Sequence, residues 1–215
     1  ILVTGAAGSI GSELVRQIAS FAPSAMMLID QAETPQHDMK LLMQNKFPSV
    51  ACSVILASIA NEERMDKLFA SFQPDYVFHA AAYKHVRMME DNPSESIQNN
   101  VYGTKVVADL SVKYGAKKFV MVSTDKAVNP TNVMGCSKRI CEIYTQSLNA
   151  KLLHDYEKNG KKGDLPTQFV TTRFGNVLGS AGSVIPLFTR QIQAGGPVTV
   201  TDPNIIRSGS LQIGA

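Results

Sequence analysis

The sequence contains no tryptophan, only three cysteines, and no apolar run that approaches the ~20 residues of a membrane-spanning helix. Cys52, Cys136 and Cys141 cannot all pair, and none stands in the C-x-x-C spacing of a zinc site, so neither a disulfide framework nor a bound metal is predicted. The formal net charge of +3 includes no dense lysine and arginine stripe, which argues against nucleic acid as a partner. The first residues are typical of a core strand rather than a signal peptide, so we expect a cytoplasmic domain.

The sequence does contain a regular alternation of strand-like and helix-like segments. Short apolar runs typical of buried strands occur at residues 1–4, 25–29, 51–56, 76–79, 118–123 and 168–172. Helical patterns separate them, starting at residue 10 and continuing at 35–46, 61–72, 93–114 and 132–156, with another at 184–194. This order predicts an α/β fold of the Rossmann type, in which a doubly wound parallel sheet has helices on both faces.

A glycine-rich turn joins the first predicted strand to the first helix. Gly5, Gly8 and Gly11 follow the strand directly, and Ser9 and Ile10 open the helix. This context is typical of a dinucleotide site: the first glycine permits a tight turn, the second lets a pyrophosphate approach, and the third lets helix and strand pack closely. The pyrophosphate then meets the N-terminus of the helix. A P-loop is excluded, because no Gly-Lys-Ser/Thr follows.

Asp30 ends the second strand, 19 residues after Gly11 (30 − 11). An acidic residue near this offset accepts hydrogen bonds from the adenosine ribose of NAD. Gln31 and Ala32 follow, so no arginine is placed to receive the 2′-phosphate of NADP. We therefore expect NAD rather than NADP, although an aspartate at a strand end can also cap a helix or form a turn.

The candidate catalytic residues lie after the fifth strand and in the next helix. Thr124, Asp125 and Lys126 place a hydroxyl, a carboxylate and an ammonium at the carboxyl edge of the sheet, where open α/β folds bind ligands. Met134 and Lys138 are one helical turn apart on one face. Taken alone, the Thr-Asp-Lys segment could be a turn with a helix cap, and Met134 could simply pack in the core.

These residues carry a resemblance to a known family. The glycine turn, His79-Ala80-Ala81-Ala82, Asn100 within Asn-Asn-Val-Tyr-Gly-Thr, and Lys138 resemble the extended short-chain dehydrogenases/reductases. More narrowly, the segments 82–86, 123–130 and 173–180 resemble the nucleotide-sugar 4,6-dehydratases of bacterial capsule and O-antigen biosynthesis. The resemblance implies that Ala80, Ala81, Ala82, Asn100 and Lys138 contact the cofactor or fix its site.

The resemblance also implies a reaction, the 4,6-dehydration of UDP-N-acetylglucosamine or a close relative. Sugar C4 is oxidised by hydride transfer to NAD while a base, which Asp125, Lys126 or a bound water must supply, takes the 4-hydroxyl proton. The C5 proton and the 6-hydroxyl are then lost as water, and the hydride returns to C6. Lys126 takes the C5 proton, Asp125 assists the leaving hydroxyl, and Thr124 orients the 4-hydroxyl. Position 134 holds methionine where the wider superfamily has a tyrosine base, as in one membrane-linked branch of the dehydratases, and a thioether cannot accept that proton.

Further residues match family positions that hold the UDP-sugar: Lys84, His85, Arg173, Asn176, Ser183, Pro186 and Arg207. Lys84 and His85 could instead belong to a solvated loop. We expect residues 1–174 to form the NAD-binding domain with the catalytic residues, and 175–215 to be the incomplete start of a nucleotide-sugar-binding lobe, because the resemblance ends near Arg207.

The resemblance further implies a homo-oligomer and a parent protein anchored at the cytoplasmic face of the bacterial inner membrane. Because Ile1 already belongs to a strand and is not preceded by methionine, we expect the chain to be part of a longer protein.

Two other functions remain open from the sequence. A nucleotide-sugar 4-epimerase shares the first hydride transfer but needs no elimination, and Lys126 together with the missing tyrosine argues against it. A non-catalytic cofactor-binding module is the second alternative.

Overall fold

The computed structural model describes residues 1–177, 184–200 and 209–210. It divides the chain into two compact units, Ile1–Arg173 and Phe174–Ala215. The division falls near the end of the sixth strand of the first unit. All the residues proposed from sequence to bind the cofactor or to catalyse the reaction lie in this first unit.

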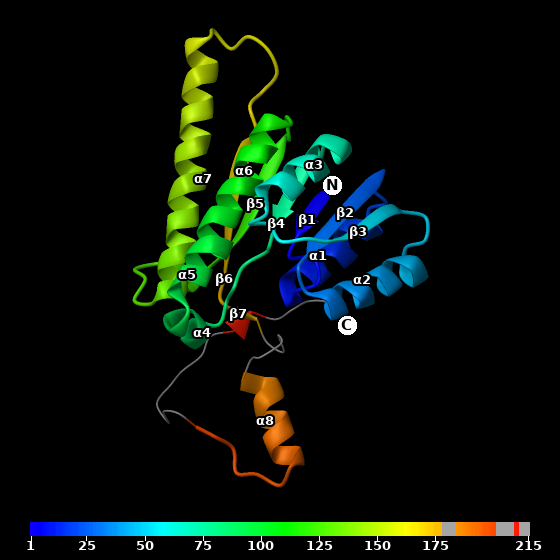
Figure 1. Cartoon of the computed structure of the whole chain (residues 1–215), viewed down its shortest axis with the longest axis vertical. Coiled ribbons are helices and arrows are strands. Elements are labelled where there is room, and N and C mark those ends of the chain that lie inside the picture. The colour runs from blue at the N-terminus through cyan, green and yellow to red at the C-terminus, as the bar shows by residue number, and fades with distance from the viewer. Residues whose placement is uncertain (178–183, 201–208, 211–215) are drawn as a thin grey trace. The chain divides into compact units, whose positions relative to one another are not determined.

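A six-stranded sheet forms the centre of the first unit (Figure 1). Its strands follow the order β3-β2-β1-β4-β5-β6, and β1 with β2, β1 with β4, β2 with β3 and β4 with β5 pair in parallel. Their bounds are β1 Leu2–Thr4, β2 Ala25–Asp30, β3 Ala51–Leu56, β4 Tyr76–His79, β5 Lys118–Thr124 and β6 Gln168–Phe174. This is the strand order of the Rossmann fold, so the predicted fold class is confirmed. The order reverses between β1 and β4, where such sheets bind ligands.

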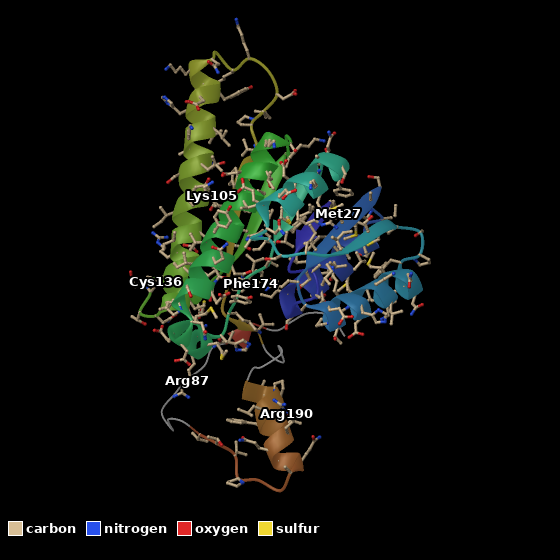
Figure 2. All side chains as sticks on the ribbon, in the orientation of Figure 1. Met27, Arg87, Lys105, Cys136, Phe174 and Arg190 are labelled. Atoms are coloured by element: carbon tan, nitrogen blue, oxygen red, sulfur yellow. The ribbon has the colours of Figure 1, made fainter. Side chains whose placement is uncertain are left out.

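Helices pack on both faces of the sheet, as the continuous apolar strands require. On one face Leu2 and Met27 meet Phe69 and Val107, from helices α3 (Glu62–Phe72) and α6 (Gly103–Lys113). On the other face α1 (Ser9–Ser20) and α2 (Glu33–Lys46) pack on β1 and β2. Figure 2 labels Met27 on its strand within the first of these cores. Because helices bury both faces of the sheet, apolar and polar residues do not alternate along its strands.

Asparagine side chains define the start of two helices. Asn61 Oδ1 accepts a hydrogen bond from the Arg64 amide at 3.0 Å, and Asn132 Oδ1 accepts one from the Gly135 amide at 2.7 Å. Each satisfies an amide that the first helical turn leaves without an intrahelical partner. The second cap begins α7 (Val133–Lys158), which lies beside α6 (Figure 1).

The helix predicted at 93–114 is confirmed in its extent, because residues 93–113 are helical without a break, but its middle part is π-helical. The chain forms α4 (Val86–Asp91), α5 (Pro93–Glu95), a π-helical segment η1 (Ser96–Tyr102) and only then α6. Within η1 the adjacent side chains of Asn99 and Asn100 are both buried. Such π turns are frequent at functional sites.

The second unit contains β7 (Asn176–Val177), α8 (Val184–Gln193) and β8 (Gly209–Ser210). β7 and β8 pair in parallel, with Asn176 opposite Gly209. Across the described part of the chain, no helix combines the length and apolar character needed to cross a bilayer.

Candidate functional site

The glycine turn is held closed by contacts that leave no room for side chains. Gly5 has a φ of +67°, and a Cβ built there would lie 2.5 Å from the Ala81 amide nitrogen. A Cβ on Gly11 would lie 1.9 Å from the Gly5 carbonyl oxygen. Gly8 is the N-cap of α1 and supplies no capping side chain. The turn therefore leaves the positive end of a helix uncapped by the protein's own side chains, as a phosphate site requires.

The Asp30 carboxylate is fixed beside this turn by two backbone amides. Its Oδ2 accepts from Ala7 and its Oδ1 from Ala32, each at 3.0 Å. Each carboxylate oxygen has lone-pair capacity beyond one hydrogen bond, so the fixed carboxylate can also accept from ribose hydroxyls. The next residue, Gln31, donates to the Tyr83 hydroxyl at 3.0 Å and so joins the end of β2 to the loop after β4.

The loop after β4 begins with Ala80, Ala81 and Ala82, which lie next to the glycine turn. The Ala80 amide donates to the Thr4 carbonyl at 3.0 Å. At the end of β4, His79 is fully buried between the Thr4 hydroxyl at 2.7 Å and the Thr104 hydroxyl at 2.9 Å. Burial, with a smaller effect from the charge of Lys138, lowers the pKa of His79 to about 3, so the imidazole is neutral. It is a structural link rather than a base.

Asn100 ties that loop to α7. Its Oδ1 accepts from the Tyr83 amide at 2.7 Å, and its Nδ2 donates to the Tyr83 carbonyl at 3.0 Å and the Ser137 hydroxyl at 3.0 Å. The residue is completely buried. Its amide thus sets the position of the helix turn that carries Lys138.

Thr124, Asp125 and Lys126 meet on one carboxylate oxygen. Asp125 Oδ1 accepts from the Thr124 hydroxyl at 2.9 Å and from Lys126 Nζ at 3.0 Å. Burial opposes ionisation of Asp125, but the hydrogen bonds from Lys126 and Thr124 outweigh it and lower the pKa of its carboxyl group. The short helix η2 (Asp125–Ala127) begins here, with Thr124 as its cap. The sequence left a capping role and a catalytic role open, and the Thr124 hydroxyl does accept from the Lys126 amide at 3.3 Å.

The start of α7 packs tightly against this cluster. A Cβ on Gly135 would lie 2.3 Å from the Lys126 carbonyl oxygen, so only glycine allows the helix to come this close. Met134 and Lys138 are both buried, with relative exposures of 3% and 4%. Burial lowers the pKa of Lys138, while Cys141 and Glu142 raise it by charge rather than by a hydrogen bond. An amino group buried in this position is suited to a hydrogen bond with a ligand hydroxyl.

Sequence reasoning missed two glutamates of the site. Glu90 of α4 accepts from the Val133 amide at 2.7 Å and so caps α7 from outside. Glu142 is completely buried and binds Ser123, Arg139 and Arg173. Its position four residues after Lys138, on the same helix face, was the available signal.

The residues proposed for the UDP-sugar are spread over both units. Lys84 and His85 precede α4 at the loop after β4, and partial burial lowers the pKa of the Lys84 ammonium. Arg173 donates through Nε and Nη2 to Glu142 at 2.8 and 2.7 Å. Asn176 lies in β7 and Pro186 in α8. Ser183 and Arg207 lie outside the described residues.

The site fits a dinucleotide. Three observations support the fit: the uncapped glycine turn, the Asp30 carboxylate beside it and the buried Lys138 ammonium. Among the described residues, no group of three or more His, Cys, Asp or Glu side chains could hold a metal ion.

Comparisons with known proteins identify the family of the chain. Residues 1–209 match the polysaccharide biosynthesis protein family. The capsular polysaccharide biosynthesis protein CapD of Staphylococcus aureus is 48% identical over 96% of this chain and 33% of its own length. The UDP-N-acetylglucosamine 4,6-dehydratase (inverting) of Campylobacter jejuni is 34% identical over 96% of this chain and 58% of its own. The UDP-glucose 4-epimerase of Rickettsia canadensis is 35% identical over 96% and 57%.

A solved structure, Pen from Bacillus thuringiensis, superposes with a TM-score of 0.84 at 32% identity and covers 98% of this chain and 60% of that one. The chain thus spans between a third and three fifths of the length of these relatives. With its extended short-chain dehydrogenase/reductase fold and the family match along nearly all of its residues, the chain belongs to the polysaccharide biosynthesis protein family.

Proposed function

We propose that this chain contains the NAD site and the catalytic residues of a nucleotide-sugar 4,6-dehydratase, a lyase that acts on a UDP-N-acetylhexosamine such as UDP-N-acetylglucosamine. The observation that carries the proposal is the ion pair of Asp125 and Lys126, 3.0 Å apart at the end of β5, beside a helix that has Met134 where the superfamily has a tyrosine base. An acid and a base in contact are what an elimination needs.

The residues that would hold NAD are those of the glycine turn, Asp30 and Lys138. The pyrophosphate would lie at the start of α1, the adenosine ribose at Asp30, and the nicotinamide ribose at Lys138. When bound, NAD supplies a hydride acceptor for sugar C4 and a hydride donor for C6. Because the cofactor ends each cycle as NAD⁺, we propose that it stays tightly held.

The Asp125–Lys126 pair can balance the protons of the elimination by itself. One proton moving from Lys126 Nζ to Asp125 Oδ1, over 3.0 Å, converts the ion pair into a neutral amine and a carboxylic acid. The amine then takes the C5 proton and the acid protonates the departing 6-hydroxyl, which leaves as water. The pair is again charged, as at the start. The Lys126 ammonium, whose protons exchange with solvent, then protonates C5 as C6 is reduced, and the proton lost by the 4-hydroxyl in the first step balances this transfer. A substrate that excludes water favours the neutral form, because desolvation disfavours both charges.

Thr124 is suited to orient the substrate. Its hydroxyl already points to Asp125 Oδ1 at 2.9 Å, so a sugar hydroxyl that binds Thr124 lies next to the acid and the base. We propose that the UDP part is bound by Lys84, His85, Arg173, Asn176, Ser183, Pro186 and Arg207, with residues 175–215 beginning the nucleotide-sugar lobe.

We also propose the setting that the family resemblance implies. The protein acts as a homo-oligomer, in the cytoplasm or at the cytoplasmic face of the inner membrane, and makes sugars for surface polysaccharide or glycan.

The rival function is a 4-epimerase. It is favoured by the 35% sequence identity to the UDP-glucose 4-epimerase of Rickettsia canadensis. An epimerase needs a base for the 4-hydroxyl but no acid and base for C5 and C6. In an epimerase the paired Asp125 and Lys126 would have no elimination to perform, and this pair is what favours the dehydratase.

Incubation with UDP-N-acetylglucosamine and NAD⁺ in deuterated water separates these functions. A dehydratase yields a 4-keto-6-deoxy sugar with deuterium at C5, detected by mass spectrometry and proton NMR. A 4-epimer without deuterium would reject the dehydratase in favour of the epimerase. Binding of NAD without any turnover would favour a non-catalytic module.

The cofactor preference is tested at Asp30. We expect the protein to bind NAD at least ~10-fold more tightly than NADP, because the Asp30 carboxylate accepts from the ribose and repels a 2′-phosphate. Asp30→Ala should weaken NAD binding by about 10–100-fold and remove the preference. Isothermal titration measures both affinities, with Asp38→Ala on the exposed face of α2 as the control. Equal binding of NAD and NADP by the unmodified protein would contradict the assignment.

A further inference from the structure

Glu142 is a fully buried carboxylate that accepts hydrogen bonds from three side chains, those of Ser123, Arg139 and Arg173. Its Oε1 accepts from the Ser123 hydroxyl at 2.7 Å and from Arg173 Nε at 2.8 Å. Its Oε2 accepts from Arg173 Nη2 at 2.7 Å and from Arg139 Nη1 at 3.0 Å. Although burial raises its pKa, these donors, Arg173 foremost, outweigh burial and lower the pKa of Glu142 to about 2. These donors therefore favour the charged form of the Glu142 carboxylate.

The partners of Glu142 lie at the points where the proposed reaction needs precise geometry. Ser123 is the residue before Thr124, so its hydrogen bond holds the end of β5. Arg173 is held at the end of β6 by a two-pronged contact, which fixes orientation as well as distance. Glu142 itself is one turn of α7 beyond Lys138, and its charge favours the ammonium form of Lys138.

We propose that Glu142 is a positioning residue, which locks the catalytic end of β5 to Arg173 and to the turn of α7 that carries Lys138. This inference rests on the proposed function for its effect on turnover, but not for its effect on NAD binding. Stability alone is a weak explanation, because buried ion clusters commonly add little stability relative to apolar side chains.

The effect on Lys138 gives the proposal a signature in pH. The titratable and charged groups that act on Lys138 are Cys141 and Glu142 of α7 and, from β4, the neutral His79. Removal of the Glu142 charge lowers the pKa of Lys138, so its ammonium form is lost at a lower pH. The pH at which NAD affinity falls should therefore move downward in Glu142→Gln. A purely structural role would lower the melting temperature without moving that midpoint.

Asp109→Asn is the matched control. Asp109 of α6 binds Tyr144 of α7 and Lys105, so it also anchors α7 to another element through a carboxylate, away from β5. We expect Glu142→Gln to lower kcat by about 10–100-fold with KM for the sugar changed less than threefold, and to shift the NAD midpoint. Asp109→Asn should keep the midpoint of the unmodified protein. Glu142→Asp, which retains the charge, should restore the midpoint.

If NAD affinity falls at the same pH in Glu142→Gln as in Asp109→Asn, the proposal is overturned. If Glu142→Gln does not fold, Ser123→Ala decides: a kcat about 10-fold lower at an unchanged melting temperature supports the positioning role, and an unchanged kcat overturns it. If the unmodified protein binds NAD but forms no dehydrated sugar, the proposed function has failed, and the NAD midpoints of Glu142→Gln and Glu142→Asp still test Glu142.

Discussion

Lys126→Ala is expected to lower kcat for formation of the 4-keto-6-deoxy sugar by about 10³-fold, the usual range for loss of a general base. The substitution removes the amino group that lies 3.0 Å from Asp125 Oδ1 and that exchanges a proton with it in the proposed elimination. The NAD affinity should stay within about twofold, because Lys126 is not among the residues assigned to the cofactor. Deuterium incorporation at C5 should be lost together with the product, and mass spectrometry follows both.

Lys118→Ala is the matched control for this prediction. Lys118 is an exposed lysine at the other end of the same strand, β5, so its loss changes the net charge by the same amount. We expect turnover within about twofold of the unmodified protein, as for most exposed substitutions. Persistent C5 exchange in Lys126→Ala would show that another group removes this proton, and the assignment of Lys126 as the base would then be wrong.

Most of the fold followed from local patterns along the chain. The six apolar runs, with a helical pattern in each gap, predict the parallel sheet, because strands buried on both faces have no polar alternation. The helix starts at Asn61 and Asn132 also followed from local chemistry, since each side chain caps its own helix. The π-helical segment around Asn100 did not, because the hydrogen bonds of the Asn100 side chain reach Tyr83 and Ser137, far away in the sequence.

The site shows the same division between local and long-range interactions. The glycine turn, Asp30 and the Thr-Asp-Lys segment can be recognised in the sequence, because each of them is a short local motif at the end of a single strand. The spacing of Lys138 and Glu142 would predict an ion pair between them within the helix. In the structure Glu142 instead binds Arg139 and Arg173, and the latter is 31 residues away. Only the packing of β6 beside β5 brings that arginine to the carboxylate.

Gly11→Ala is expected to weaken NAD binding by about 100-fold or more and to lower the melting temperature. The Cβ of an alanine at this position would lie 1.9 Å from the Gly5 carbonyl oxygen. Because the atoms that it would meet belong to the backbone of Gly5 and Ala6, the turn itself would have to open. Gly8→Ala is different, because its Cβ would lie 3.4 Å from the same oxygen, an ordinary contact, at a backbone φ of −71° that alanine adopts freely. That variant should keep the melting temperature and still lose NAD affinity, since its methyl group would occupy the approach of the pyrophosphate.

Gly160→Ala provides the control for loss of a glycine as such. Gly160 follows α7, has a φ of +71°, and a Cβ there would meet nothing within 4 Å. It should cost about 1 kcal/mol of stability from backbone strain and leave NAD affinity unchanged. Differential scanning fluorimetry and isothermal titration measure the two quantities for all three variants. Unchanged NAD affinity in Gly8→Ala would mean that no phosphate approaches the N-terminus of α1, and this variant decides the question even if Gly11→Ala does not fold.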